Sequence, residues 1–273
     1  MKQLKVGFVG AGNMASSIIG GLLEQGVPAE NISASDPSVE CLDRLATLGP
    51  IATSQDNREA VNGADVVILA VKPQVMTAVT GTIRDALSTQ GAMAISIAAG
   101  ITLQSLEQGL GSTTAIVRCM PNTPALLRAG ASALYANAAT GSEQRHLAET
   151  ILAAVGTVCW VPEESQLDAV TALSGSGPAY FFLFMEAMVA AGIRLGLDPE
   201  TSRELAVQTG LGSARMAAVG DTSLEELRRR VTSPGGTTER AVESFEAAGL
   251  RAIVDAAMTA AAARSEELAR EMG

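Results

Sequence analysis

Short apolar runs alternate with longer amphipathic segments along the first part of the chain. The run 66–71 is continuously apolar, which is typical of a strand covered on both faces in a parallel sheet, and mainly apolar runs at 6–9, 94–97 and 115–120 predict further strands. Weaker runs predict further strands at 31–37, 132–135 and 157–161, the last two at the sheet edge. This alternation predicts a Rossmann-type, doubly wound α/β sheet over residues 1–162.

The pattern changes at Pro162, and only helical periodicity follows. Residues 163–273 are therefore expected to form an all-α domain, in which the segment 174–178 breaks the chain and Pro178 restarts a helix. The most apolar run, 179–193, contains Glu186 and is shorter than the roughly 20 residues that span a bilayer, so it predicts a buried core helix. The alanine-rich helices carry apolar faces too large for one small domain, which predicts packing against a second subunit.

Charge and cysteine content narrow the class of protein. A net charge of −10 argues against nucleic acid or an anionic membrane as a partner, because phosphate contacts need a basic face. Cys41, Cys119 and Cys159 are few and widely spaced, which indicates a reduced, cytoplasmic protein with neither disulfides nor a metal site. The chain enters its first strand directly, so no signal peptide is expected.

The sequence from Val6 to Ala15 predicts a dinucleotide site. Gly10 and Gly12 follow a strand and open a helix, with Ala15 completing the spacing G-x-G-x-x-A. In such a motif the first glycine allows the turn, the second lets the backbone approach a pyrophosphate, and the small third residue allows close packing of helix and strand. Free N–H groups at the helix start would hold the phosphates.

The end of the second strand leaves the choice of cofactor open. Asp36 stands where an acid would accept a hydrogen bond from a ribose 2′-hydroxyl, which favours NAD. Donors that would instead suit the 2′-phosphate of NADP are also present: Ser33, Ser35, Ser38, Arg44 and Arg58. The sequence alone is compatible with either NAD or NADP.

Other strand ends also carry candidate chemistry. Lys72 follows the apolar run 66–71, and since the chain has only Lys2 and Lys5 besides, we expect it to face the cofactor. The strand at 94–97 ends in the small residues 98–100, which would let a nicotinamide approach. Prolines at 121 and 124 make a rigid loop at the same edge of the sheet.

Two clusters of small residues, 174–178 and 233–238, stand at expected helix starts. Backbone N–H groups at such positions form a nest for a carboxylate, and Thr237 and Thr238 add hydroxyl donors. Either cluster alone is a common helix-linking turn, but both together with a dinucleotide fold indicate substrate binding.

Taken together, these motifs resemble the pyrroline-5-carboxylate reductase family over essentially the whole chain. The segments that carry the resemblance occur in the family's order: 10–15, 71–73, 96–100, 120–124, 174–180 and 233–238. The resemblance implies NAD(P)H-dependent reduction of 1-pyrroline-5-carboxylate to L-proline, with NADP(H) preferred and NAD(H) also used. It further implies a homodimer with interlocked C-terminal helices, assembled into a decamer, with sites between subunits.

The resemblance also implies site residues. Those expected at the dinucleotide are Gly10, Ala11, Gly12, Asn13, Met14, Ser35, Asp36, Asn57, Ala70, Val71, Lys72, Pro73 and Ala99. Those expected at the substrate are Met120, Asn122, Ser176, Gly177, Ser233, Gly235, Gly236, Thr237 and Thr238. Ser233 and Thr238 are the expected catalytic pair, with Thr238 at the ring nitrogen and no metal involved.

Two other functions are compatible with a two-domain plan of this kind. A β-hydroxyacid dehydrogenase has a similar two-domain plan but needs a catalytic lysine on the first long helix of the helical domain, and residues 178–195 contain none. A non-catalytic protein that senses NADP with the same fold stays open, because binding motifs alone do not establish turnover.

Overall fold

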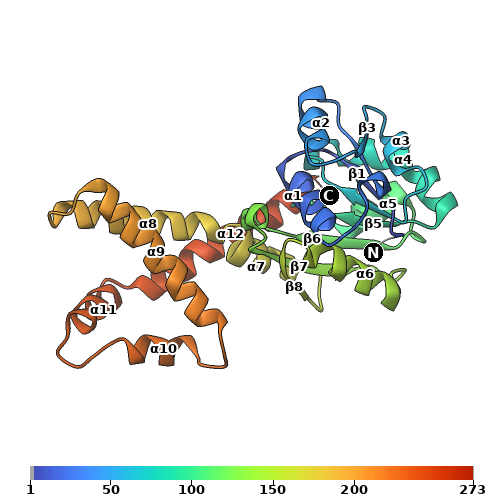
Figure 1. Ribbon diagram of the computed structural model, residues 1–273. Coiled ribbons are helices and arrows are strands. Elements are labelled where there is room, and N and C mark those ends of the chain that lie inside the picture. Colours follow the sequence, from blue (N-terminus) through green and yellow to red (C-terminus); the bar gives the residue numbers. More distant parts are fainter. Residues whose placement is uncertain (1–2, 273) are drawn as a thin grey trace. The chain divides into compact units, whose positions relative to one another are not determined.

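The computed structural model describes residues 3–272 (Figure 1). Contacts divide the chain into two compact units: one runs up to Ser176 and takes in the last helix from Ala260, and the other is Gly177–Thr259. This division by packing differs from the expected boundary between residues 162 and 163, because the segment after 162 and the end of the last helix both pack with the sheet.

The first unit is built on an eight-stranded sheet with the strand order β3-β2-β1-β4-β5-β6-β7-β8. Its strands are β1 (Val6–Val9), β2 (Ile32–Ser35), β3 (Ala52–Ser54), β4 (Val66–Leu69), β5 (Met93–Ser96), β6 (Ile116–Met120), β7 (Gly130–Ala136) and β8 (Gly156–Trp160). All neighbouring pairs are parallel except β6 and β7. The predicted Rossmann-type sheet is therefore confirmed.

The position of β7 corrects one expectation. Only β8 lies at that edge of the sheet, whereas β7 pairs with both β6 and β8. The connection between β6 and β7, residues 121–129, is shorter than the roughly dozen residues that a parallel crossover needs, so the chain turns back antiparallel. Strand β3 was not predicted, because its residues Ala52–Ser54 are largely exposed and show no apolar run.

Helices cover both faces of the sheet. They are α1 (Asn13–Glu24), α2 (Val39–Ala46), α3 (Asn57–Val61), α4 (Met76–Gln90), α5 (Leu103–Leu110), α6 (Ser142–Ala153) and α7 (Gln166–Val170), with 3-10 turns η1 (Ala29–Asn31), η2 (Pro73–Val75) and η3 (Thr123–Leu127). Along β4, Val66 and Ile68 join one core cluster, and Val67 and Leu69 join the other. Successive side chains of a strand point to opposite faces, so a strand buried on both faces is continuously apolar.

The segment 174–178 does not interrupt the helix, contrary to the prediction. Residues Thr171–Gly175 form a π-helical turn, η4, between α7 and α8 (Gly177–Arg194). The Ser176 N–H donates to the Thr171 carbonyl at 2.8 Å, the i to i−5 pairing of a π-helix. Glycine and serine here therefore accommodate a bulge within one long helix rather than start a new one.

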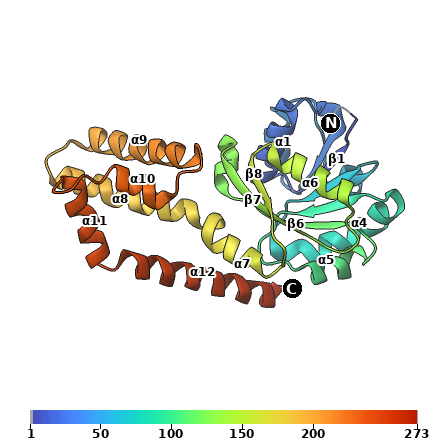
Figure 2. The same ribbon diagram turned by 90° about the horizontal axis from the view of Figure 1, so that it is seen from below.

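The second unit contains α8, α9 (Pro199–Ala218), α10 (Leu224–Arg230), α11 (Thr237–Ala247) and the first part of α12 (Leu250–Met272), as Figure 2 shows. Asp198 caps α9 by accepting from the Glu200 and Thr201 N–H groups. Ser223 caps α10 by accepting from the Glu226 N–H. The helical character of this half of the chain is confirmed.

The prediction that 179–193 is a buried helix is wrong for the single chain. Only Gly177 is buried in α8, while Phe181, Phe182 and Leu183 keep 67%, 65% and 67% of their surface. By length and composition alone the continuous helix Gln166–Arg194, which contains an 18-residue window with a mean hydropathy of 1.3, could cross a bilayer. Exposed aromatic side chains of this kind also suit a helix that packs against another subunit.

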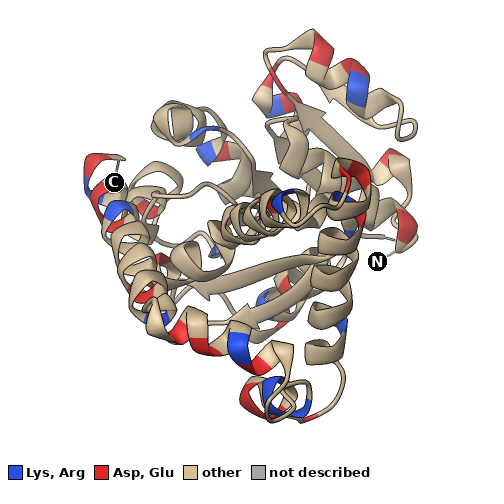
Figure 3. Ribbon diagram, turned by 90° about the vertical axis from the view of Figure 1, so that its left-hand side faces the viewer, with Lys and Arg blue, Asp and Glu red and all other residues tan. Residues whose placement is uncertain are grey.

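Basic and acidic residues both occur along the helices, with long uncharged stretches between them (Figure 3). Glu246 of α11 pairs with Arg228 of α10 and with Arg251 of α12, and hydrogen bonds from Arg251 lower the pKa of its carboxyl. These exposed pairs tie neighbouring helices of the second unit together, although each contributes little by itself.

A first prediction concerns the antiparallel end of the sheet. The buried Asn137 side chain accepts from the Ile116 N–H and donates to the Thr114 carbonyl and to Glu107. Asn137→Ala leaves these buried backbone groups unpaired, which should lower the free energy of unfolding by about 2–4 kcal/mol. Urea denaturation at fixed protein concentration measures the change. The exposed Asn62→Ala is the control, and equal losses in the two variants would contradict the assignment.

Candidate active site

The carboxyl ends of the parallel strands meet in one row. The Gly10 N–H donates to the Ser35 carbonyl at 2.7 Å, and the Ala70 N–H donates to the Val9 carbonyl at 2.8 Å. The Ile97 N–H donates to the Leu69 carbonyl at 3.1 Å. The loops after β2, β1, β4 and β5 are therefore joined side by side, and they carry most of the predicted cofactor residues.

The two glycines after β1 have different roles. Gly10 has φ +103°, and a Cβ there would lie 2.5 Å from the Ala70 carbonyl oxygen, so only glycine fits against β4. Gly12 faces open space, with no atom within 4 Å of the position a Cβ would take. That open space at a helix start is what the approach of a phosphate requires.

The start of α1 supplies donors for an anion. The N–H groups of Asn13, Met14 and Ala15 have no acceptor within the helix, and no side chain caps it. The helix dipole adds partial positive charge at this end. A pyrophosphate therefore fits here both by space and by donor chemistry.

The carboxylate of Asp36 accepts hydrogen bonds from the backbone of the protein itself. One oxygen accepts from the Ala11 N–H at 2.9 Å, and the other accepts from the Ser38 N–H at 2.8 Å. Asp36 thus holds the glycine loop against the end of β2. An acid engaged in this way offers less to a ribose hydroxyl than the sequence suggested.

The predicted serine donors also point inward. Ser35 is completely buried, and its hydroxyl donates to the side-chain oxygen of Asn57 at 2.8 Å. Ser33 donates to the Ala60 carbonyl, and the Ser38 hydroxyl oxygen caps α2. Because Ser35 occupies the Asn57 oxygen, the Asn57 amide nitrogen is left as the donor for a ligand. The Ser35 hydroxyl therefore contacts the Asn57 side chain inside the protein.

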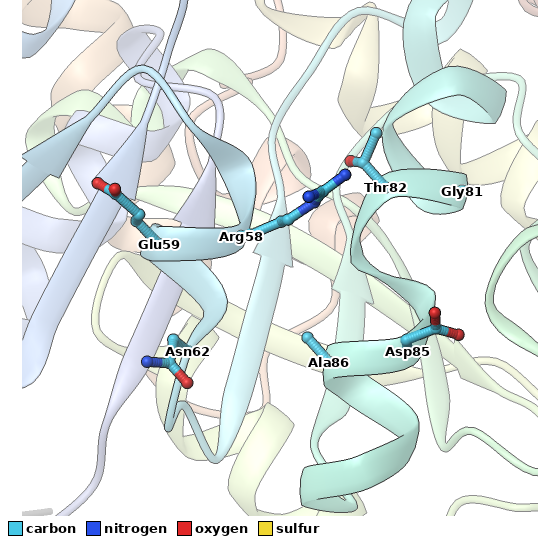
Figure 4. Close-up of a pocket in the computed structure, with 7 residues that line it drawn as sticks. All are labelled: Arg58, Glu59, Asn62, Gly81, Thr82, Asp85 and Ala86. Atoms are coloured by element: carbon cyan, nitrogen blue, oxygen red, sulfur yellow. The ribbon is translucent and has the colours of Figure 1, made fainter.

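The two candidate arginines lie apart. The exposed Arg44 brings its guanidinium to 3.4 Å from the Ala11 carbonyl, beside the glycine loop. Arg58 extends from α3 toward Thr82 of α4, over a groove of about 600 Å³ whose wall includes, apart from Arg58 itself, none of the residues expected at the dinucleotide (Figure 4). Of the two arginines, only Arg44 lies beside the glycine loop.

The loops after β4 and β5 present few side chains. Lys72 and Ala99 are exposed, while Ala70, Val71 and Pro73 are partly exposed at the same edge. The small side chains leave the backbone accessible there, and Lys72 adds one positive charge. This placement agrees with the nicotinamide approach expected from the sequence.

The structure brings two of the predicted motifs together. A Cβ on Gly175 would lie 2.5 Å from the Met120 Cε, the far end of a flexible side chain, so the π-helical turn packs closely on the end of β6. Asn122 donates to the Ser174 carbonyl at 3.0 Å and accepts from the Ala131 N–H at 2.8 Å. The oxygen and the nitrogen of the Asn122 side chain therefore both join segments of the chain. Ser176 is the residue directly after the π-helical turn.

The loop 233–238 is exposed and leads into α11. Gly235 has φ +72°, and its N–H donates to the Glu239 carboxylate at 2.7 Å, while the Gly236 N–H donates to the Ser233 carbonyl. The two glycine amides expected to hold a carboxylate are thus already paired in the single chain. The donors left at the start of α11 are the N–H groups of Thr237, Thr238 and Glu239, because no side chain caps the helix.

Sequence reasoning missed Glu164. This carboxylate accepts from the Leu103 N–H at 2.6 Å and pairs with Arg118 at 2.5 Å, next to the loop that follows β5. The signal was Arg118 itself, a charge within an otherwise apolar strand, which needs a partner when it is largely buried.

Comparison with known proteins identifies the family. A family model described as pyrroline-5-carboxylate reductase dimerisation matches residues 164–268, and one described as NADP oxidoreductase, coenzyme F420-dependent, matches residues 5–100. The pyrroline-5-carboxylate reductase of Pseudomonas aeruginosa is 54% identical over 273 residues, 100% of both chains. The chain belongs to the pyrroline-5-carboxylate reductase family.

Solved structures of the reductase family have the same fold. The reductase from Coxiella burnetii superposes with a TM-score of 0.94 at 45% identity, covering 97% of this chain and 98% of that one. The Plasmodium falciparum enzyme, solved with NADP bound, gives 0.86 at 31% identity, covering 98% and 99%. The protein is therefore an oxidoreductase with an N-terminal Rossmann-like domain and a C-terminal dimerisation domain.

A second prediction concerns Cys119, which lies on β6 within the reductase's site region. Burial raises the pKa of its thiol to about 12, against a smaller opposing effect of a hydrogen bond with Ser132. The thiol is therefore protonated at pH 8, and it should resist alkylation in the folded enzyme. Iodoacetamide at pH 8 followed by peptide mass spectrometry checks this, with urea-unfolded protein as the positive control. Rapid labelling of Cys119 in the folded protein would contradict it.

Proposed function

We propose that the protein reduces 1-pyrroline-5-carboxylate to L-proline with NAD(P)H, the final step of proline biosynthesis. The observation that carries the proposal is the similarity to a curated reductase over the entire chain, which includes both the dinucleotide edge and the loop 233–238. In this proposal residues 1–162 bind the nucleotide, and residues 163–273 bind substrate and form the dimer.

The dinucleotide is assigned to the row of strand ends. The amides of 13–15 take the pyrophosphate at the open space beside Gly12, and the Asn57 amide nitrogen faces the adenosine side. Lys72 and the backbone around Ala99 border the nicotinamide side. When bound, the reduced cofactor supplies the hydride, so the protein's task is to orient substrate and to manage one proton.

The substrate is assigned to the loop 233–238. Its carboxylate takes the free N–H groups at the start of α11 together with the Ser233 hydroxyl, and it competes with Glu239 for the Gly235 N–H. Thr238 donates to or accepts from the ring nitrogen. A substrate that enters as the protonated iminium needs no strong acid, which agrees with a chain that has one histidine and no lysine beyond Lys72.

For the nucleotide, we propose that NADPH is preferred and NADH is accepted. Two contacts support this preference: both oxygens of Asp36 are engaged with backbone N–H groups, and the Arg44 guanidinium lies exposed beside the glycine loop. A 2′-phosphate gains a charge-assisted partner in Arg44, whereas a 2′-hydroxyl gains little from an Asp36 already in use.

The assembly and location are further parts of the proposal. The exposed apolar side chains of α8 lie within residues 164–268, which match the dimerisation model, and this supports a homodimer. A decamer of such dimers rests on the family resemblance alone. The free cysteines agree with a reduced, cytoplasmic location.

The first test of the proposal is turnover. Purified protein mixed with pyrroline-5-carboxylate and NADPH or NADH should consume reduced cofactor and form proline. Thr238→Ala should lower kcat by about tenfold or more, because the lost hydrogen bond acts on the reacting ring, and leave the KM for cofactor within about twofold. Thr222→Ala, outside the loop, is the control. Binding of NADPH with no proline formed by the wild-type protein would favour the sensor alternative.

A separate test addresses the cofactor preference. Arg44→Ala should raise the KM for NADPH by about tenfold or more and leave the KM for NADH within about twofold, because only NADPH carries a 2′-phosphate that can pair with the guanidinium. Arg145→Ala, at the β8 end of the sheet, is the control. Equal effects on the two cofactors would remove Arg44 from the 2′-phosphate site.

A further inference from the structure

The end of α12 packs against the sheet unit through one stripe of side chains. Within residues 260–272, the residues that lose surface recur at helical spacing, as one face of a helix requires: Ala261, Ala262, Ser265, Leu268, Ala269 and Met272. The part of the helix from Ala260 onward belongs to the sheet unit by its contacts, and Figure 2 shows this end of α12.

The stripe is anchored by a hydrogen bond. Ser265 is buried, and its hydroxyl donates to the Asp168 carboxylate of α7 at 2.6 Å. A bond between a hydroxyl and a carboxylate is charge-assisted, so it fixes the position of α12 along α7. The turns that follow Ser265 are thereby directed to a defined place on the sheet unit.

That place is the loop after β5. Gly100 is buried with φ +74°, and a Cβ on it would lie 3.4 Å from the Leu268 Cβ and 3.5 Å from the Leu268 carbonyl carbon. The helix backbone therefore lies directly against the loop backbone. Ala99, the neighbour of Gly100, is a predicted cofactor contact.

The final turn reaches the loop after β4. The Gln74 side-chain nitrogen lies 4.0 Å from the Met272 sulfur, and Gln74 follows Lys72 and Pro73. Met272 also packs on the second core cluster, together with Val71 and Ala98. The same short stretch of α12 thus contacts both loops that border the nicotinamide side.

We propose that Leu268 and Met272 are positioning residues for the cofactor, holding the loops 72–75 and 97–101 in the conformation that binds reduced nicotinamide. This assignment rests on the proposed function, since it concerns the same cofactor site. Neither side chain touches the cofactor, and both act through the backbone of Gly100 and through Gln74.

The test measures NADPH binding without turnover. Leu268→Ala and Met272→Ala should each raise the dissociation constant for NADPH, followed by the fluorescence of the bound cofactor, about three- to tenfold. Leu268→Met and Met272→Leu, which keep the apolar volume, should bring it back to within about twofold of the wild type. Arg270→Ala, on the exposed face of the same turns, is the matched control.

Two further measurements separate positioning from general stability. Amide hydrogen exchange of 72–75 and 97–101 should quicken in the alanine variants, and the KM for pyrroline-5-carboxylate should stay within about twofold. An unchanged NADPH dissociation constant with a lowered melting temperature would overturn the proposal. If Leu268→Ala fails to fold, Met272→Ala, at a partly exposed site, decides the question. A wild-type protein that binds NADPH but forms no proline would instead count against the proposed function alone.

Discussion

The close approach of Gly10 to the Ala70 carbonyl is the contact on which the cofactor edge depends. Any side chain at position 10 would meet that oxygen at 2.5 Å, so the turn after β1 would have to move away from β4. The hydrogen bonds that join the neighbouring strand ends run through the same place. Without this contact the free N–H groups of α1 and the loops after β4 and β5 would not lie around the same candidate cofactor site.

The carboxylates at this edge of the sheet bind mainly to groups of the protein itself. Asp36 holds the glycine loop, and Glu164 holds the Leu103 N–H and Arg118. Each of these carboxylates is held by partners from other segments, so its role is to join the chain at this edge. The reaction proposed for this family suits such a site, because hydride transfer to a protonated imine asks mainly for position.

The sheet and the dinucleotide turn could be predicted from the sequence, because continuous apolar runs and the glycine spacing are local signals. Strand β3 and the place of β7 could not, since each depends on pairing with a distant strand. The π-helical turn was missed because glycine and serine are equally typical of a break and of a bulge.

Roles of single polar side chains were the least predictable part of the site. The sequence places Ser35, Asp36 and Asn57 near the cofactor but does not show that Ser35 is buried beneath Asn57. It likewise places a carboxylate nest at Gly235 without showing that Glu239 already lies there. Such roles depend on side-chain direction, which residue spacing does not determine.

The sheet unit is discontinuous along the chain, and this bears on how it is made. Its final segment, from Ala260, is separated from Ser176 by the whole of Gly177–Thr259. A ribosome working at about 5–20 residues per second needs roughly 4–17 s for that intervening stretch. Throughout that time the nascent sheet exposes the loops at Gln74 and Gly100 that α12 later covers. The nucleotide-binding unit is therefore completed last, after the helices that join subunits have been synthesised.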